Sequence, residues 1–315
     1  LPTDLDVKDP EIMTKCLHDH RHWADKWGAG DQLGAGHLLT PANTLKALRE
    51  VQRGEVWDLS FATEMGAPGF KPAQTPYIMS ASSTARNSVK RRRAMGATND
   101  AGSNLERIEM TTHVGTHMDA LGHFSEGDLL YGGYAVDDTV DDWGLLNLGI
   151  EHCPPIISRG VMLDVAGADG GAFLENGRAV GPDDLKRALD KAKLALRPGD
   201  VVFVRTGWGK FFMNDNNRYL SGEPGLNEAA AHFLTSQDVV AIGADNMAVE
   251  VLPAEKHEIL MPVHQHCLAE AGVYLVENLA LDALAKAGIY SFCLTMIPVK
   301  FKGATGSPVR PVAIV

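Results

Sequence analysis

The sequence predicts an α/β protein, because strand-like segments alternate with helix-like segments through the middle and end of the chain. The strand-like segments are short, apolar and rich in β-branched residues, as buried strands usually are. The helix-like segments, 182–196 and 280–288, space their apolar residues at helical intervals. Acidic residues open the first of these helices, and Gly288 is the expected end of the second. The strand-like segments occupy 160–168, 200–208, 238–247, 272–279 and 288–301.

Residues 1–55 predict a helical N-terminal extension to this core. One helix is expected over 9–27. A second begins at Thr40, a residue type that caps helices, and continues with Pro41, which suits the first helical position. Glycines between the two helices indicate a loop. The whole chain, 1–315, is predicted to form a single domain that includes this extension.

Two further strands are expected before the middle of the chain. The first covers 55–63, and the second covers 107–117 and leads into a bend at Gly115. Residues 64–104 between them predict loops. The basic run at 90–93 lies in this region. It is compatible with a solvated surface and with a contact to another subunit.

The composition is that of an ordinary globular protein with an acidic excess. Hydrophobic residues make up 45% of the chain and the formal net charge is −11, which argues against nucleic acid as a partner because phosphate binding requires a cationic face. No run approaches the roughly 20 apolar residues of a membrane helix. The sequence begins without a basic region followed by an apolar one. Four widely spaced cysteines fit neither a zinc ribbon nor a disulfide framework, so a cytoplasmic location is expected.

The most informative segment is 113–123, HVGTHMDALGH. Imidazole and carboxylate are common ligands of zinc, manganese and iron. An extended strand would hold His113 and His117 about 13 Å apart, and a helix would turn Asp119 away from both. Gly115 favours a bend instead. A strand that ends in a tight loop brings all three donors together, so His113, His117 and Asp119 are predicted to bind a metal ion.

This segment resembles the H-x-G-T-H-x-D-x-x-x-H signature of the cyclase family of metal-dependent hydrolases, which includes bacterial kynurenine formamidase and isatin hydrolase. The likeness extends over almost the whole chain, to the longer members of that family. The chain differs from kynurenine formamidase in its greater length and at Leu121 and Gly122, where that enzyme has a proline after Asp-Ala. The other matching segments are WGAGDQLGAGHLLTPA at 27–42, RTGW at 205–208, IGADNMAVE at 242–250, GVYLVENL at 272–279 and KGATGSPVRPVAI at 302–314.

The resemblance implies a fold, a cofactor and an assembly. The fold is a swivelling β/β/α-type cyclase fold with a mixed sheet and flanking helices. One divalent cation, manganese or zinc, is held by His113, His117 and Asp119, and His123 acts as general acid and base. The implied assembly is a homo-dimer or a homo-tetramer.

The resemblance also implies where a second ion binds in those members that carry one. The same Asp119 bridges the two ions, and a later His and Glu complete the second site. Glu277 matches the family Glu. Two histidines precede it, and His264 is preferred over His266 as the ligand.

The function implied is an amidohydrolase. Metal-activated water opens the amide or imide C–N bond of a small cyclic or aryl-linked substrate. His123 takes a proton from the water and returns it to the leaving nitrogen. Two alternatives are a lactone hydrolase that uses the same chemistry and a catalytically silent relative that binds a metal or a small ligand.

Four residues outside the signature are candidates for binding the substrate. Arg205 suits a substrate carboxylate, which its planar guanidinium can bind with two hydrogen bonds, and a structural ion pair is the alternative. The aromatic side chains of Trp208, Phe61 and Phe70 can line an apolar pocket, although aromatic residues near strands mostly pack in the core.

Three more polar residues are candidates for supporting the metal ligands. Asp245 and Glu250 lie near a strand end and can orient ligands through hydrogen bonds. Thr116, inside the signature, can bond to a ligand or cap the bend.

Overall fold

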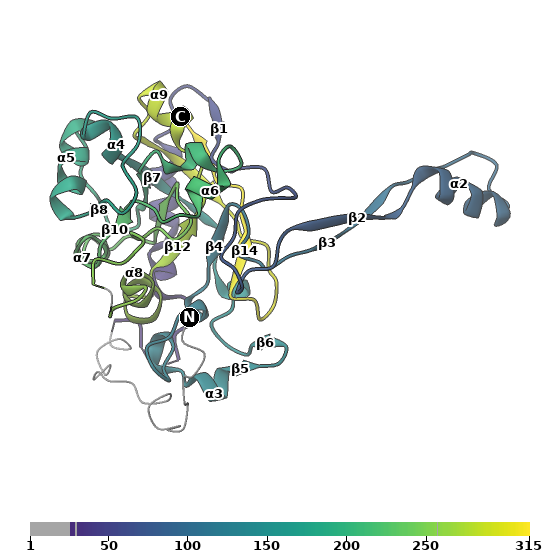
Figure 1. Cartoon of the computed structure of the whole chain (residues 1–315), viewed down its shortest axis with the longest axis horizontal. Helices are drawn as coiled ribbons and strands as arrows, with labels where there is room; N and C mark the ends of the chain where they lie inside the picture. Colours follow the sequence, from purple (N-terminus) through teal and green to yellow (C-terminus); the bar gives the residue numbers. More distant parts are fainter. Residues whose placement is uncertain (1–25, 29, 257) are drawn as a thin grey trace.

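A curled mixed sheet lies at the centre of the computed structural model, which describes residues 26–28, 30–256 and 258–315 (Figure 1). Across this described part of the chain, the strand order is β1 (Val56–Asp58), β15 (Val312–Ile314), β13 (Ser291–Met296), β7 (Ile156–Asp164), β9 (Val201–Arg205), β11 (Ala241–Ala244), β12 (Tyr274–Glu277), β4 (His117–Asp119) and β14 (Gly306–Pro308). The central strands from β7 to β12 pair in parallel, and the strands on either side pair antiparallel. This architecture confirms the predicted α/β class with a mixed sheet.

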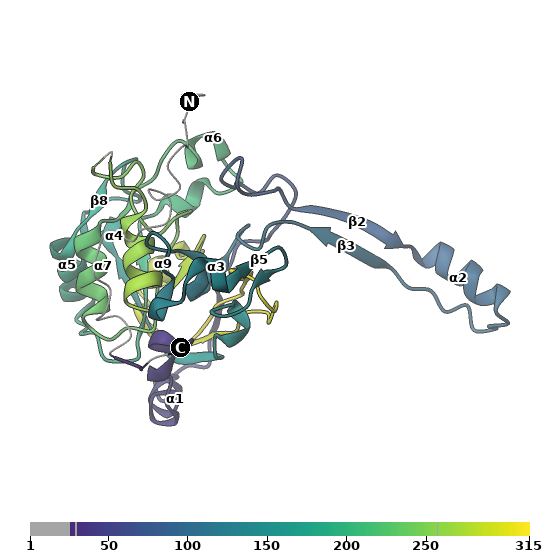
Figure 2. The ribbon, with the colours of Figure 1, turned by 90° about the horizontal axis from the view of Figure 1, so that it is seen from below.

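The parallel strands are buried along almost their whole length. Every residue of β9, β11 and β12 is buried. Parallel strands that are covered on both faces have continuous apolar runs rather than an alternating pattern, which explains why segments such as VVFVR and YLVE could be recognised from the sequence. Helices and loops supply the covering layers (Figures 1 and 2).

The helices that the sequence predicted after residue 180 are confirmed. In α5 the acidic side chains of Asp183 and Asp184 lie in the first turn, and the carboxylate of Asp184 accepts a hydrogen bond from the backbone of Gly181 at 2.8 Å. Helix α9 ends at Gly288, whose φ of 69° is the left-handed conformation that ends many helices. The α-helices of the described residues are α1 (Pro41–Leu48), α2 (Ala85–Ala94), α3 (Val136–Thr139), α4 (Val165–Ala168), α5 (Pro182–Ala192), α6 (Asn216–Tyr219), α7 (Glu228–Thr235), α8 (Pro262–His264) and α9 (Asp282–Ala287).

Shorter elements join these helices and strands. A π-helix, η6 (Gln265–Glu270), continues α8, and three two-stranded sheets lie apart from the central one. The 3-10 helices are η1 (Gly34–Leu38), η2 (Leu121–His123), η3 (Tyr131–Gly133), η4 (Ile150–His152) and η5 (Trp208–Phe211). The small sheets pair β2 (Ile78–Ser83) with β3 (Leu105–Glu109), β5 (Val140–Asp141) with β6 (Gly144–Leu145), and β8 (Ala179–Val180) with β10 (Gly225–Leu226).

The helix predicted to begin at Thr40 and Pro41 is confirmed. Helix α1 begins with Pro41, and the hydroxyl of Thr40 accepts a hydrogen bond from the backbone of Asn43 at 3.2 Å, as expected of a cap. The helix ends at Leu48 rather than continuing to residue 55. Most of the helix expected over 9–27, namely residues 9–25, lies outside the described residues.

The prediction that 64–104 is rich in loops is right for 64–77 and 95–104 and wrong for the segment between them. This region contains β2 and α2, and together with β3 they form an arm that projects from the body of the molecule (Figures 1 and 2). The exposed strands of the arm bury no apolar face and therefore lack the alternation by which a strand is recognised. The strand predicted over 107–117 is divided, because β3 ends at Glu109 and β4 begins at His117.

No helix among the described residues has both the length and the apolar character of a membrane span.

Candidate metal centre

The centre is built on β4, a three-residue strand between β12 and β14. Successive side chains of a strand point to opposite faces, so His117 and Asp119 lie on the same face. His117 pairs directly with Glu277 of β12, which brings a second carboxylate to that face. A bend at Gly115, whose φ is 72°, returns His113 to the same place. The strand and tight bend that the sequence predicted are both present, with the bend before the strand.

A glycine makes room for the first histidine. Gly306 of β14 pairs with Asp119, and a Cβ atom at Gly306 would lie 2.6 Å from Cε1 of His113. The imidazole of His113 therefore fills the space that a side chain would otherwise occupy. Its Nε2 atom lies 2.9 Å from the hydroxyl oxygen of Thr305, which leaves Nδ1 facing Asp119.

Asp119 is shared among three imidazoles. Its Oδ1 atom lies 2.8 Å from Nδ1 of His113 and 3.4 Å from Nε2 of His117. Its Oδ2 atom lies 3.8 Å from Nε2 of His264. The donors form two adjoining groups that can each hold a cation, one of His113, His117 and Asp119 and one of Asp119, His123 and His264.

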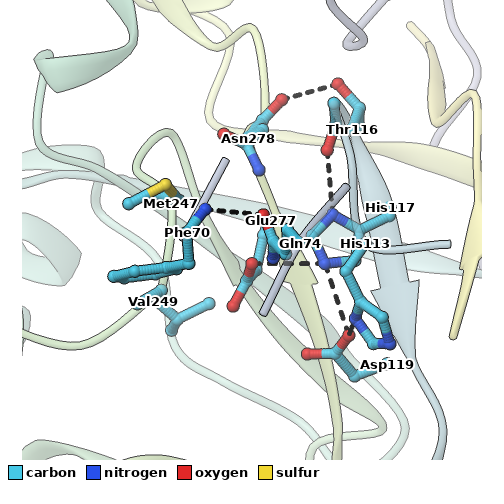
Figure 3. Close-up of polar contacts among 12 residues, drawn as sticks. Phe70, Gln74, His113, Thr116, His117, Asp119, Met247, Val249, Glu277 and Asn278 are labelled. Carbon is cyan, nitrogen blue, oxygen red and sulfur yellow. Dashed lines mark hydrogen bonds and ion pairs between the residues drawn. The ribbon is translucent and has the colours of Figure 1, made fainter. Parts of the chain in front are cut away.

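Glu277 lies between two of these histidines. One carboxylate oxygen is 3.2 Å from Nε2 of His117, and the other is 3.2 Å from Nε2 of His264. Figure 3 shows the contacts of His117 with Glu277 and with Asp119. The structure therefore brings together all five residues that the sequence predicted as ligands of one or two ions, His113, His117, Asp119, His264 and Glu277.

Hydrogen bonds on the outer side of the rings determine which nitrogen faces the centre. Nδ1 of His117 lies 2.8 Å from the carbonyl oxygen of Gly115, which can only accept, so Nδ1 carries the proton. Nδ1 of His264 lies 2.6 Å from a carboxylate oxygen of Glu250, which also accepts backbone hydrogen bonds from Val263 and His264. When each ring is neutral with its proton on Nδ1, it presents the Nε2 lone pair inward, as metal-binding histidines do.

The donor set fits a divalent cation. Nε2 of His117 and both carboxylate oxygens of Asp119 are buried, and each lacks a hydrogen-bond partner within the described residues. Buried polar atoms in proteins are almost always satisfied, so these three atoms, which make only ion-pair contacts within the centre, favour a bound cation. Imidazole nitrogens and carboxylate oxygens are donors that zinc and manganese accept.

The electrostatics of the site also favour a cation, because carboxylates surround the imidazole rings. Burial disfavours the charged form of His117, but the nearby carboxylates of Glu277 and Asp119 outweigh burial and raise its pKa to about 10. Burial also opposes the charge on His264, yet the hydrogen bonds to Glu250 and Glu277 raise its pKa to about 10. Burial acts to raise the pKa of Asp119, but the neighbouring imidazoles hold that pKa well below its ordinary value. Positive charge is therefore stabilised at the point where the donors meet.

His123 lies in η2, directly after the strand that carries the ligands. Its ring stacks on that of His113 with 4.1 Å between the centroids, and the centroid of His264 is 6.2 Å away. Burial lowers the pKa of His123 to about 4, so the imidazole is neutral at pH 7. A neutral imidazole beside the donor cluster can accept a proton.

The structure separates His266 from this centre. Nδ1 of His266 lies 2.6 Å from a carboxylate oxygen of Glu270, and Nε2 lies 2.8 Å from the hydroxyl of Thr235. Its ring packs against the exposed ring of His232 on α7. This geometry agrees with the preference for His264 as the residue that faces Asp119.

Two candidates for substrate binding lie elsewhere. The guanidinium of Arg205 is 2.6 Å from Asp164 and 2.7 Å from Asp282, and it also donates to the carbonyl of Ala172. The structure thus favours the ion pair that was the alternative for Arg205. The side chain of Trp208 is completely buried in a small core cluster, so the structure favours the core packing that was the alternative for this aromatic residue.

Phe61 and Phe70 remain at accessible positions. The ring of Phe61 stacks on Phe212 at 4.5 Å and lines a groove of about 670 Å³ that also includes Thr116 and Ile297. Phe70 is 37% exposed on the loop before β2 and is drawn with the centre in Figure 3. Both can contact a ligand in a way that Trp208 cannot.

Thr116 acts as a structural link rather than as a partner of the metal ligands. Its hydroxyl donates to the backbone carbonyl of Asn278 at 2.6 Å (Figure 3). The same hydroxyl accepts a hydrogen bond from the backbone of Phe61 at 2.9 Å. The carboxylate of Asp245 accepts hydrogen bonds from Thr206 and Gly207 rather than from a predicted ligand. Of these three candidates, only Glu250 contacts a predicted ligand, as the sequence suggested it can.

Sequence reasoning missed the contact of His113 with Thr305. The two residues are almost two hundred positions apart, and they meet because β14 pairs with β4. A threonine in the matching segment at 302–314 carried no signal of its own.

The fold and the site define a metal-binding α/β protein, and comparisons with known proteins place it in a family. A family model described as "Putative cyclase" matches residues 57–251, so the chain belongs to this cyclase family. A crystal structure described as a novel cyclase has a TM-score of 0.84 at 30% identity and covers 95% of this chain and 99% of that one.

More distant relatives carry functional names. "Cyclase-like protein 1" of Oryza sativa subsp. japonica is 24% identical over 91% of this chain and 87% of its own length. The kynurenine formamidase of Polaromonas naphthalenivorans is 25% identical over 66% of this chain and 74% of its own length. Isatin hydrolase A from Ralstonia solanacearum shares the fold, with a TM-score of 0.63 at 20% identity over 87% of this chain and 97% of that one.

Proposed function

We propose that the protein is a metal-dependent hydrolase that opens the amide or imide C–N bond of a small cyclic or aryl-linked substrate. The observation that carries this proposal is the set of three buried atoms without hydrogen-bond partners, Nε2 of His117 and both oxygens of Asp119, beside a neutral His123. The relatives named kynurenine formamidase and isatin hydrolase support hydrolysis of a C–N bond.

In this proposal, His113, His117 and Asp119 hold one divalent cation, manganese or zinc. His264 and Glu277 complete a second site where a second ion binds, with Asp119 shared between the two. When bound, the cation supplies Lewis acidity, which polarises a carbonyl group and makes water a nucleophile near neutral pH. Glu250 keeps His264 in the tautomer that a metal ion requires.

His123 moves the proton that the reaction requires. Its neutral ring accepts a proton from water and then donates that proton to the leaving nitrogen, because an amine leaves readily only when protonated. Phe61 and Phe70 are proposed to contact the apolar part of the substrate.

We further propose that the chain forms one catalytic domain that assembles with copies of itself as a dimer or tetramer. The cytoplasmic location stays a prediction from the sequence.

A paired-substrate assay tests the function. Protein stripped with a chelator is reloaded with manganese or zinc, and hydrolysis is measured for cyclic amides, cyclic imides and the lactones of the same ring size. We expect turnover of an amide or imide only after reloading, and His117→Ala is expected to lose both the metal and the activity. Amide hydrolysis that survives complete removal of metal would disprove the proposal, and turnover of lactones alone would support the lactone alternative.

A further inference from the structure

A second cluster of metal-binding side chains lies where α7 packs beside α8 and η6 (Figure 1). His232 on α7, and His266 and Glu270 on η6, each offer one donor atom, and these three atoms lie within 4.8 Å of one another. We call these three residues the surface site. His266 follows His264 by only two positions, but residues two apart on a helix do not face the same way. The two histidines therefore serve different places.

Hydrogen bonds determine which nitrogen of His266 faces Glu270. The hydroxyl of Thr235 donates to the carbonyl oxygen of His232 at 3.2 Å, so it accepts at its 2.8 Å contact with Nε2 of His266. Nε2 therefore carries a proton, and Nδ1 lies 2.6 Å from a carboxylate oxygen of Glu270. Both Nδ1 and this oxygen offer lone pairs, so a positive charge is needed between them. A proton supplies that charge in the metal-free chain, and a divalent cation can replace it.

His232 supplies a third donor. Its ring centroid lies 3.6 Å from that of His266. Partial burial and the nearby imidazole of His266 lower the pKa of His232, so its ring is neutral at pH 7 and keeps one nitrogen lone pair. Nε2 of His232 lies 3.9 Å from a carboxylate oxygen of Glu228, one turn earlier on α7. Glu228 is therefore within reach as a fourth donor.

The donor set selects the kind of ion. Two imidazoles with carboxylates suit Zn²⁺, whereas Mg²⁺ and Ca²⁺ take oxygen ligands. Ligand atoms around a tetrahedral zinc ion lie about 3.3 Å apart, so the donors must approach one another slightly. The side chain of His232 is 53% exposed, which leaves it room to rotate. A surface hollow of about 320 Å³, lined in part by His232, Thr235 and Glu270, gives an ion access to the site.

We propose that the surface site binds a further divalent cation of the zinc type, with Glu228 as the fourth ligand. The ion links α7 to η6, which continues the helix that ends at His264. It therefore fastens the segment that carries one of the donors of the metal centre. Because the exposed side chains of His232 and Glu228 lose freedom on binding, this site should fill at higher zinc concentration than the buried centre. The proposal does not rest on the reaction proposed for the centre.

Equilibrium dialysis against Zn²⁺ tests the site in a variant with a disabled centre. His117→Ala with Asp119→Ala removes donors from both groups of the centre. In this background, a further His232→Ala or His266→Gln should each weaken the binding of one zinc ion per chain. Loss of an outer partner alone costs a metal site about 10–100-fold in affinity, so loss of a ligand should cost at least about tenfold. Mg²⁺ at the same concentration should not compete.

His152→Ala is the matched control. Nε2 of His152 lies 3.8 Å from a carboxylate oxygen of Glu151, as in the pair of His232 with Glu228, but His152 belongs to no such cluster among the described residues. This variant should bind zinc as the background does. Circular dichroism checks folding, and if the background is unfolded, the same substitutions are compared in the wild-type chain in the weaker phase of the zinc titration. Anomalous scattering from crystals grown with Zn²⁺ locates the ion.

Several results would overturn the proposal. One is zinc binding that His232→Ala leaves unchanged, and another is an equal loss in His152→Ala. No uptake of Zn²⁺ up to about 1 mM would also exclude the site. An anomalous peak away from His232, His266 and Glu270, with none among them, would exclude it as well, and competition by Mg²⁺ would refute the assignment to a zinc-type ion.

Discussion

Each of the three histidines that face Asp119 has a second partner that orients its ring. His117 donates to a backbone carbonyl, His264 contacts Glu250, and His113 contacts Thr305. These outer bonds hold the rings in place and leave one nitrogen of each directed at the carboxylates. The precision of the centre therefore depends on residues that would not bind the ion themselves.

The role of His123 can be separated from metal binding. His123→Ala should retain the metal content of the wild type and lower kcat by about 10²–10⁴-fold, the usual size of a general acid–base contribution. Elemental analysis and steady-state kinetics on the same preparations measure both quantities. Loss of metal together with activity would instead make His123 a ligand, which its position near Asp119 and His264 also allows.

Metal binding should release protons. Without a cation, His117 and His264 have pKa values of about 10, so both rings are protonated at pH 7 and must lose their protons before their nitrogens can bind a metal. Apparent affinity should therefore rise with pH up to about 10, by up to about tenfold per pH unit for each proton released. Isothermal titration calorimetry in buffers of different ionisation enthalpy counts these protons. Affinity that does not change between pH 6 and 9 would contradict the raised pKa values.

At the scale of elements, an N-terminal carboxylate stabilises α5. Asp184 accepts hydrogen bonds from both terminal nitrogens of Arg178, from Arg187 and from the backbone of Gly181. The hydrogen bonds with Arg178, partly opposed by burial, lower the pKa of Asp184 to about 2. A lowered pKa contributes stability above the ordinary value of 3.8, and this stability is lost as the pH falls toward 2.

Asp184→Asn should lower the free energy of unfolding by about 2 kcal/mol near neutral pH, since the lost bonds involve charged groups. Denaturant unfolding from pH 7 downward should show a constant difference from the wild type that narrows below about pH 4. Asp183→Asn is the matched control, because Asp183 is exposed and should change stability by less than about 0.5 kcal/mol. A difference that persists unchanged at acid pH would rule out the ionisation of Asp184 as its cause.

The elements that could be predicted from the sequence are those in which buried positions carry apolar residues in a recognisable pattern. The apolar strands β7, β9, β11 and β12 were recognisable because they lie in the core, and α5 was recognisable from its helical spacing and acidic first turn. The arm was missed because its strands are exposed on both faces and leave no periodic pattern.

The site was predictable where its donors are close in the sequence. His113, His117 and Asp119 lie within seven residues, and the bend at Gly115 could be inferred from steric arguments. His264 and Glu277 were assigned only through the resemblance to a family. For Arg205 and Trp208 the sequence left substrate binding and a structural role both open, because a sequence does not reveal the burial and ion pairs that engage such side chains.

At the scale of the whole molecule, the metal ion should contribute to folding stability. Removal of the ion leaves His117 and Asp119 buried with unsatisfied atoms, and a ligand that binds only the folded state stabilises it by mass action. Free metal at a hundred times its dissociation constant should add about 2.7 kcal/mol to the free energy of unfolding. Thermal unfolding with and without a chelator measures the shift, and His117→Ala should abolish it. Equal melting temperatures in wild-type protein would show that no ion is bound by the folded chain.

The position of β14 constrains when the centre can form during synthesis. Gly306–Pro308 pairs with the strand of His117 and Asp119, although almost two hundred residues separate the two strands in the sequence. Until β14 has left the ribosome and paired with β4, the groove that receives the ring of His113 has no wall and Thr305 is absent from it. The centre is therefore completed only after β14 has been synthesised, and a chain that stops before residue 305 carries the whole histidine signature without a completed cage.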